Sequence, residues 1–378
     1  MSENAFVVVF PSIFAKNKVK QLESNIKKIL KIKNQEFRKI KRDDSVIVID
    51  ANDPVFASSA INLLFGIKKV AIAKQVKNDF NTIVSEITKI GSNLLLKGEK
   101  FYVQVEGFST GFLTKDIEIS ATSSIIEKTV KLGAKPGSKE KYDKLLYTYL
   151  TKSNAYVCVY VDDGFGGIPY NSQNERVVCA IYDELSAISC LETIKEGFDV
   201  KIIVCYKQKS DLTNLVKILN QILPRTTRSK IDVEFFQIPI KGSSSKSLLT
   251  LIDSVTEILI RVAKANKINK ISLGLSHLIF PSSFVENSIK QVFRNNFTSL
   301  IPLSGLDDGI FEDAKELGLG KYLSKIEKLG EMSFSKQYAS KIEIKKIVEN
   351  TLKKRKVVSI VIGPNNVHEI LDSLEENR

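Results

Sequence analysis

The second half of the chain alternates short apolar runs with longer amphipathic segments, and this alternation constrains the fold more than any other feature. The run Val200–Cys205, interrupted only by Lys201, lacks the in-and-out pattern of a strand that faces water on one side. Such runs are typical of parallel strands buried on both faces. We therefore predict a doubly wound α/β domain over residues 176–340, with strands at 177–181, 200–205, 233–238 and 270–274 and helices at 185–196, 211–223 and 248–262.

The first 76 residues show a different order of elements. Strands are predicted at 5–10, 35–41, 45–50 and 68–75, and helices at 16–31 and 54–65. Asp53-Pro54 marks the start of the second helix, because aspartate caps a helix and proline fits its first turn. The order β-α-β-β-α-β predicts a ferredoxin-like domain over residues 1–76.

A second α/β domain is predicted over residues 77–165. It contains helices at 80–95 and 116–132, a strand at 101–106, and a hairpin of strands 145–151 and 154–161. The glycine-rich stretch Gly164–Pro169 marks a boundary and leads into a linker, residues 166–175. Residues 341–378 form a C-terminal extension with a strand at 357–362 and a helix from Asn365.

The composition excludes several classes of protein. Four cysteines (Cys158, Cys179, Cys190 and Cys205) and two distant histidines (His277 and His368) indicate neither a disulfide framework nor a His/Cys zinc site. We expect buried, inert cysteines and no metal. The chain has no apolar run long enough to span a bilayer and no basic segment typical of a signal peptide, so we expect a cytoplasmic protein without a membrane partner.

The excess positive charge is concentrated near the N-terminus. The formal net charge is +13, and between Ala15 and Arg42 eleven basic residues face only two acidic ones. Within the predicted helix an apolar stripe faces the core, and a lysine row of Lys16, Lys20, Lys27 and Lys31 lies on another face. The row is either a solubilising surface or a footprint for a phosphate backbone. The candidate contacts are Lys16, Lys18, Lys20, Lys27, Lys28, Lys31 and Arg42.

Four short motifs, in order along the chain, resemble those of one family. Ile13–Lys18 resembles E-I-F-L-K-S, Phe65-Gly66-Ile67 resembles R-x-F-G-I, Gly164–Pro169 resembles G-P-G-G-L-P, and Ile301–Leu303 with Leu317-Gly318 resembles R-P-L-I…I-G. The family is that of the tRNA 4-thiouridine synthetases, or tRNA sulfurtransferases. The resemblance implies a ferredoxin-like domain, a THUMP RNA-binding domain and a PP-loop adenylating domain, and it extends to about Lys336.

The motif that would hold ATP in this family is altered. Where the family has S-G-G-x-D-S, this chain has Ile181–Ser186, and no glycine lies between Gly167 and Gly197. Phosphate binding at a helix N-terminus needs close approach to backbone N–H groups, and glycine permits that approach. Here two carboxylates would cap the helix and repel the triphosphate. Tyr182, Asp183, Glu184 and Ser186 are therefore interpreted as a degenerate nucleotide-binding loop.

Other functional motifs of the family also differ. The family's T-G-E aligns with Leu273-Gly274-Leu275, and its persulfide cysteine aligns with Leu329. In the THUMP-like segment a paired basic motif is replaced by Glu106-Gly107-Phe108, which leaves Lys115 and Thr122 as candidate polar contacts. No catalytic residue is assigned.

Three functions remain open on these grounds. The first is a tRNA-binding protein that contacts the acceptor region of tRNA but neither adenylates nor thiolates it, and needs no cofactor. The second is an active tRNA sulfurtransferase that uses ATP and Mg²⁺ through divergent residues. The third is a scaffold or regulatory subunit of a tRNA-modification complex, as a homo- or hetero-oligomer. The resemblance favours tRNA over DNA as the nucleic-acid partner.

Overall fold

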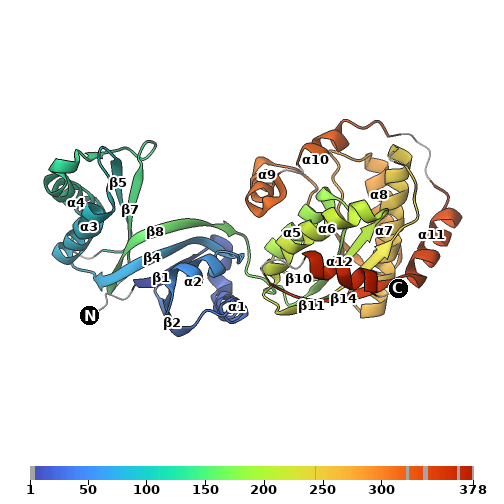
Figure 1. Cartoon of the computed structure of the whole chain (residues 1–378), viewed down its shortest axis with the longest axis horizontal. Helices are drawn as coiled ribbons and strands as arrows, with labels where there is room; N and C mark the ends of the chain where they lie inside the picture. The colour runs from blue at the N-terminus through green and yellow to red at the C-terminus, as the bar shows by residue number, and fades with distance from the viewer. Residues whose placement is uncertain are drawn as a thin grey trace. The chain divides into compact units, whose positions relative to one another are not determined.

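The computed structural model describes residues 5–109, 111–242, 244–320, 323–334, 339–363 and 367–376. The chain forms two compact units, residues 1–167 and residues 168–378, drawn in Figure 1. We call them unit 1 and unit 2. Each unit has its own β-sheet, eight-stranded in unit 1 and six-stranded in unit 2.

The first half of unit 1 has the predicted ferredoxin-like order. Strand β1 lies between β3 and β4 and pairs antiparallel with both, while β2 pairs with β3 at the sheet edge. The Asp53 carboxylate accepts the N–H groups of Val55 and Phe56 at 3.0 and 3.1 Å, as the start signal predicts. The elements are β1 (Ala5–Pro11), α1 (Val19–Ile32), β2 (Phe37–Asp43), β3 (Val46–Ala51), α2 (Pro54–Ile61) and β4 (Ile67–Lys77).

The second half of unit 1 continues the same sheet. The long strands β4 and β8 pair antiparallel from Ile67–Gly166 to Lys77–Asn154, so the two predicted domains share one sheet in the order β2-β3-β1-β4-β8-β7-β5-β6. The elements are α3 (Phe80–Leu94), β5 (Lys100–Gly107), α4 (Thr114–Lys128), β6 (Lys135–Pro136), β7 (Lys144–Leu150) and β8 (Asn154–Gly166). Helices α3 and α4 pack over a separate core around Ile87, Phe101 and Ile125.

Strand β1 is rich in valine because both of its faces are buried. Val7 and Val9 face a core under α1 and α2, while Val8 and Phe10 face a second core with Tyr147 and Tyr156 from β7 and β8. Alternate residues of one strand therefore belong to different cores. The edge of Phe10 packs on the ring of Tyr149, 5.0 Å between centroids, as aromatic pairs prefer.

A polar cluster ties the two halves of unit 1 together. The Asp43 carboxylate, at the end of β2, accepts hydrogen bonds from Thr151 (3.0 Å), Asn154 (2.8 Å) and Tyr156 (2.5 Å), which lie in or beside the β7–β8 hairpin. Gln75 donates to the Asn154 amide oxygen at 2.7 Å and extends the cluster to β4. The sheet brings these residues together although more than one hundred positions separate Asp43 from Tyr156.

Unit 2 has the predicted doubly wound α/β fold. Its sheet has the order β13-β12-β9-β10-β11-β14, with β9 paired in parallel to β10 on one side and to β12 on the other. Apart from Lys201, whose side chain is largely buried, the apolar run in β10 is completely buried. The elements up to residue 300 are β9 (Arg176–Ile181), α5 (Glu184–Lys195), β10 (Asp199–Tyr206), α6 (Lys209–Ile222), β11 (Lys230–Gln237), α7 (Ser245–Asn266), β12 (Lys270–Ser272), α8 (Ser282–Arg294) and β13 (Thr298–Leu300).

The predicted linker and C-terminal extension are both packed into unit 2. Tyr170 contacts the Asp199 carboxylate, which Arg228 also binds at 2.6 Å. After α9 (Asp308–Ala314), a π-helical turn (Lys315–Leu319) and α10 (Leu323–Gly330), the chain forms α11 (Lys341–Lys353), β14 (Lys356–Val361) and α12 (Val367–Glu376). Strand β14 adds antiparallel to β11, α11 packs on α7, and α12 packs on α6 (Figure 1).

A buried ion-pair group anchors the C-terminal segment to the sheet. The Glu234 carboxylate of β11 is almost completely buried and contacts Lys201 at 2.7 Å and Arg355 at 3.3 Å. Two cations therefore compensate the burial of this carboxylate. Within the part of the chain that the structure describes, no helix is both long and apolar enough to cross a membrane.

Candidate nucleic-acid interface and degenerate nucleotide loop

The lysine row begins on a short 3-10 helix and continues on α1. Residues Ile13–Lys18 form the 3-10 helix, so α1 starts three residues later than predicted. The Ser12 hydroxyl caps this turn by accepting the Ala15 N–H at 3.2 Å and donates to the Gly167 carbonyl at 2.6 Å. Lys16 and Lys18 therefore lie in the turn, whereas Lys20, Lys27, Lys28 and Lys31 lie on α1.

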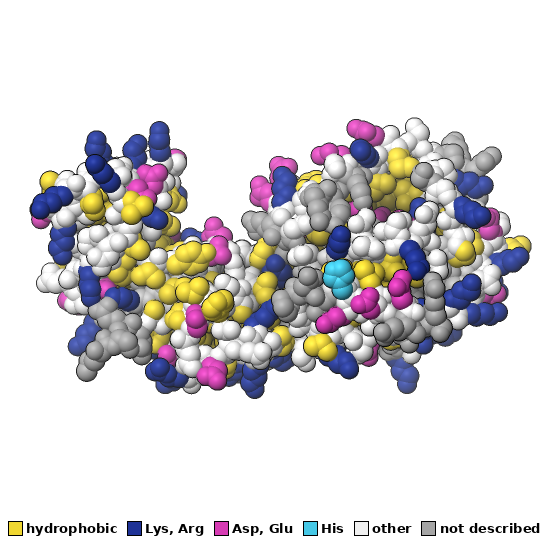
Figure 2. Space-filling view, in the orientation of Figure 1, with side chains coloured by type: hydrophobic (Ala, Val, Ile, Leu, Met, Phe, Trp, Pro, Cys, Tyr) yellow, Lys and Arg dark blue, Asp and Glu magenta, His cyan; other side chains and the backbone are white. Residues whose placement is uncertain are grey.

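The two faces of α1 have the predicted character. Leu22, Ile26 and Ile29 are at most 1% exposed and pack on the sheet. The lysines on the turn and on α1 are all exposed to solvent. Among the described residues no acidic side chain pairs with Lys16, Lys20, Lys27, Lys28 or Lys31. Figure 2 shows basic side chains along the edge of unit 1 that α1 and β2 form in Figure 1.

Two other candidate contacts are paired with acids of unit 1. Arg42 forms an ion pair with Glu23, and the hydrogen bond to that carboxylate raises the pKa of Arg42. Lys115 contacts Glu118 at 2.9 Å on α4, which raises the pKa of Lys115. Figure 1 places α4 at the opposite end of unit 1 from α1, so Lys115 does not join the lysine row. The Thr122 hydroxyl donates to the Glu118 carbonyl at 2.6 Å within the helix.

A second basic surface lies at the α4 end of unit 1 and was not identified from the sequence. Its exposed members between α4 and β7 are Lys128, Lys131, Lys135, Lys139 and Lys141. Beside them the rings of Tyr102 and Tyr142 stack at 5.9 Å, and Tyr142 is 41% exposed. The sequence shows this surface as five lysines within fourteen positions. It was not singled out because the cluster near the N-terminus is larger.

The loop Ile181–Ser186 of unit 2, interpreted from its sequence as a degenerate nucleotide-binding loop, forms the N-terminal cap of α5. The Asp183 carboxylate accepts the Ser186 N–H at 2.8 Å, and the Ser186 hydroxyl accepts the N–H groups of Tyr182 and Asp183 at 2.9 and 3.0 Å. This reciprocal arrangement is a capping box. Three backbone donors of this loop, the N–H groups of Tyr182, Asp183 and Ser186, are therefore already bonded within it.

The Tyr182 side chain closes the crevice where the sheet reverses its strand order. Ligands of doubly wound domains bind at the carboxyl ends of the strands beside this point, here β9 and β12. Tyr182 is 8% exposed, and its hydroxyl donates to the Gly274 carbonyl, which follows β12, at 3.1 Å. A Cβ atom at Gly274 would lie 2.7 Å from Ser186, so the two loops are in direct contact. Burial raises the pKa of Tyr182 well above its ordinary value, which keeps the phenol a donor.

The cysteines are buried as expected. All four are free thiols inside the two units. Burial raises the pKa of Cys158 and Cys205, and a hydrogen bond to Cys179 together with burial raises that of Cys190. A thiol with a raised pKa is a poor nucleophile at neutral pH. Both histidines are exposed, and among the described residues no three His, Cys, Asp or Glu side chains are grouped to hold a metal.

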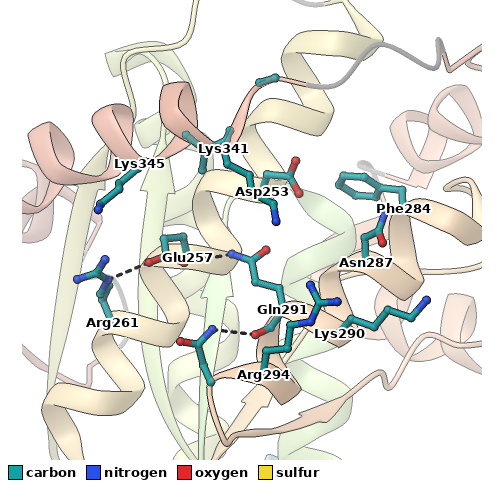
Figure 3. Close-up of a pocket in the computed structure, with 13 residues that line it drawn as sticks. Asp253, Glu257, Arg261, Phe284, Asn287, Lys290, Gln291, Arg294, Lys341 and Lys345 are labelled. Atoms are coloured by element: carbon teal, nitrogen blue, oxygen red, sulfur yellow. Dashed lines mark hydrogen bonds and ion pairs between the residues drawn. The ribbon is translucent and has the colours of Figure 1, made fainter.

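A cavity in unit 2 was also missed. It has a volume of about 530 Å³ and lies between α7, α8 and α11 (Figure 3). Its charged lining consists of Asp253 and three pairs that lie four residues apart on one helix face: Glu257 and Arg261 on α7, Lys290 and Arg294 on α8, and Lys341 and Lys345 on α11. This spacing was visible in the sequence, but only the fold brings the three helices together.

Comparison with curated proteins finds two relatives, both described as probable tRNA sulfurtransferases. No protein-family model matches the chain. A probable tRNA sulfurtransferase of Methanosarcina acetivorans is 23% identical over 188 residues, which are 49% of this chain and 45% of the relative. A second, from Methanosarcina mazei, is 23% identical over 191 residues, 49% of this chain and 46% of the relative. The matched part of the chain thus spans about half the length of these curated relatives.

Two solved structures share the fold. A 4-thiouridine synthetase in complex with RNA and bound ATP superimposes with a TM-score of 0.66 at 16% identity, covering 95% of this chain and all of that one. The protein PH1313 of Pyrococcus horikoshii superimposes with a TM-score of 0.61 at 19% identity, covering 83% of this chain and all of that one. The chain therefore resembles the tRNA sulfurtransferases in sequence over about half its length and has the fold of a 4-thiouridine synthetase over nearly all of it, which confirms the resemblance inferred from its motifs.

Proposed function

We propose that this protein binds tRNA through unit 1 and neither adenylates nor thiolates it. The observation that carries the proposal is a contrast between the two units. Unit 1 keeps an exposed lysine row without acid partners among its described residues, while in unit 2 Tyr182 closes the crevice at β9 and β12. The similar sequences are those of probable tRNA sulfurtransferases, and one structure with this fold holds RNA.

Binding by unit 1 would be mainly electrostatic. Lysines in a row neutralise successive phosphates and release condensed counterions, which supplies affinity without reading bases. A-form RNA is recognised largely by shape and backbone, and this suits an α-helix that presents ammonium groups rather than hydrogen-bonding amides. The resemblance to the synthetases points to the acceptor region of tRNA, and the basic surface around Lys131 and Lys135 offers a second contact for it.

The residues of the degenerate loop do not fit ATP. A triphosphate needs free N–H groups and a cationic or neutral surface at the helix N-terminus. Here the Tyr182, Asp183 and Ser186 N–H groups are bonded within the cap, and the Asp183 carboxylate accepts the Ser186 N–H at the helix N-terminus, where a phosphate would bind.

A gel-shift titration with total tRNA at about 100 mM salt tests the binding half of the proposal. We expect the variant K16E/K20E/K27E/K31E to lose at least tenfold in affinity. A matched control, K246E/K264E/K353E/K354E, changes four exposed lysines of unit 2 by the same charge and is expected to bind as the wild type does. Equal affinity of both variants would remove the basis for assigning binding to α1.

Release of AMP from ATP in the presence of tRNA tests the other half. We expect no tRNA-dependent AMP above the level without protein, and no 4-thiouridine in tRNA from a deficient host that expresses the chain. Turnover that depends on both tRNA and this protein would show an active sulfurtransferase with divergent residues and would contradict the proposal.

A further inference from the structure

We propose that the cavity between α7, α8 and α11 binds a phosphate-bearing small molecule of nucleotide size. The cavity lies on the sheet face that α7 and α11 share, and it is lined by none of the degenerate-loop residues. Its volume of about 530 Å³ is within the usual range for sites that enclose a small ligand. The proposal is independent of RNA binding by unit 1.

The charge of the lining favours an anion. Five cations and two carboxylates face the cavity. The Glu257 carboxylate accepts hydrogen bonds from Arg261 at 2.9 Å and from the Gln291 amide at 3.1 Å, and both bonds are drawn in Figure 3. Among the described residues Arg294, Lys341 and Lys345 have no acid partner.

Unpaired cations around one hollow repel each other, and a bound anion would remove that repulsion. Arg294 on α8 and Lys345 on α11 line the cavity from different helices, so a bound phosphate would be attracted by positive charge from both. An arginine can also bind two phosphate oxygens at once. These features favour a phosphate over a single carboxylate.

One side of the cavity is suited to a ring rather than to a phosphate. Figure 3 shows Phe284, Asn287 and Asp253 close to one another at this side. Phe284 is 2% exposed and packs on Phe280 with ring centroids 6.2 Å apart, so this apolar wall is fixed. The Asn287 amide offers a donor and an acceptor, and the Asp253 carboxyl offers two further oxygens. An apolar wall with a few convergent polar groups is what a heterocyclic base requires.

The cavity also depends on the C-terminal segment. Helix α11 supplies Lys341, Ile344 and Lys345 to the lining. The following strand β14 and the Arg355–Glu234 ion pair hold this segment on β11. The cationic wall is therefore part of the folded unit 2 rather than of a loose tail.

Isothermal titration of the full-length protein tests the proposal, with the four ribonucleoside monophosphates, the four ribonucleosides and inorganic phosphate as probes. We expect at least one monophosphate to bind with a Kd below about 1 mM, and its nucleoside and phosphate alone to bind at least tenfold more weakly. R294E/K345E should weaken that binding at least tenfold. The matched control K246E/K264E changes two exposed lysines of α7 that do not line the cavity and should bind normally.

Three results would overturn the proposal. One is that no monophosphate binds at about 5 mM. Another is that R294E/K345E, folded by circular dichroism, binds as the wild type does. The last is that the same variant loses tRNA affinity in the gel shift while no monophosphate competes, which would make the cavity part of an RNA surface instead. Loss of tRNA binding by the α1 variant alone leaves this proposal unaffected.

Discussion

Tyr182 lies where the S-G-G-x-D-S motif of the resembled family has its first glycine. Its hydroxyl is buried and bonded to the Gly274 carbonyl at 3.1 Å, and its N–H is bonded to the Ser186 hydroxyl. The bond to Gly274 joins the loops that follow β9 and β12, so Tyr182 stabilises this part of unit 2.

Removing only the hydroxyl should therefore destabilise the protein. We expect Y182F to lower the free energy of unfolding of unit 2 by about 1 kcal/mol, because the Gly274 carbonyl loses its partner in a buried place. Urea denaturation followed by fluorescence measures this change. Y206F is the control, since the described structure gives the Tyr206 hydroxyl no partner. An equal loss in both variants would mean that the bond to Gly274 contributes nothing specific.

Asp253 gives unit 2 a pH dependence of opposite sign to that of most carboxylates. Burial raises its pKa from 3.8 to about 6. As the pH rises, the Asp253 carboxyl loses its proton in the unfolded state before it does so in the folded state. The contribution of Asp253 to stability is therefore largest below pH 4 and falls until about pH 6. The full difference is at most about 3 kcal/mol, since each pKa unit corresponds to 1.36 kcal/mol. Basic side chains of α8 and α11 line the same cavity, and their attraction for the ionised Asp253 carboxylate reduces this loss of stability.

The variant D253N removes the titration. We expect it to melt at a higher temperature than the wild type at pH 7.5 and at the same temperature at pH 4. Calorimetry at both values provides the comparison. If the wild type were more stable than D253N at pH 7.5, the attraction of Lys341 and Lys345 for the Asp253 carboxylate would outweigh the cost of burying it.

At the scale of elements, the periodicity of the sequence predicted most helices and strands but not their partners. The stripe of Leu22, Ile26 and Ile29 predicted α1 and its buried face, because a helical period depends only on neighbouring residues. The pairing of Arg42 with Glu23 was not predictable, since it joins β2 to α1. The pair Lys115–Glu118, three residues apart on α4, was visible in the spacing.

The candidate sites also combine local contacts, which the sequence predicted, with contacts between distant residues, which it did not. The cap by the Asp183 carboxylate is local and was expected, although its reciprocal partner Ser186 was not, whereas the bond from Tyr182 to Gly274 spans 92 positions. Helix α8 is clearly amphipathic but was not predicted, and strand β13 has only three residues. The cavity forms where α8 meets α7 and α11, and a local sequence pattern does not show which helices meet.

The Asp43 cluster makes a prediction about elements. Asp43 is the common acceptor for Thr151, Asn154 and Tyr156, so D43A leaves three donors of the β7–β8 region without it. We expect unit 1 to lose about 2–3 kcal/mol of stability, measured by chemical denaturation. E140A, at an exposed glutamate of the same unit, should change little. A small effect of D43A would mean that packing around Tyr147 and Tyr156 alone joins the two halves.

At the scale of the whole molecule, unit 1 is structurally independent of unit 2. Unit 1 has a complete sheet, its own three cores and the Asp43 cluster, and the pairing of β4 with β8 closes it before residue 168. Nothing in that list depends on residues of unit 2. A unit with its own core is expected to fold by itself.

The fragment of residues 1–167 should therefore unfold cooperatively and bind tRNA with an affinity within a factor of about three of the full chain, a difference of less than 1 kcal/mol. Thermal denaturation and the gel shift measure both properties. The fragment of residues 168–378 is the control, and we expect it to fold without binding tRNA at the same salt concentration. If the first fragment folds but binds at least tenfold more weakly, unit 2 must supply contacts to the RNA, and the lysines of α1 would then account for only part of the affinity.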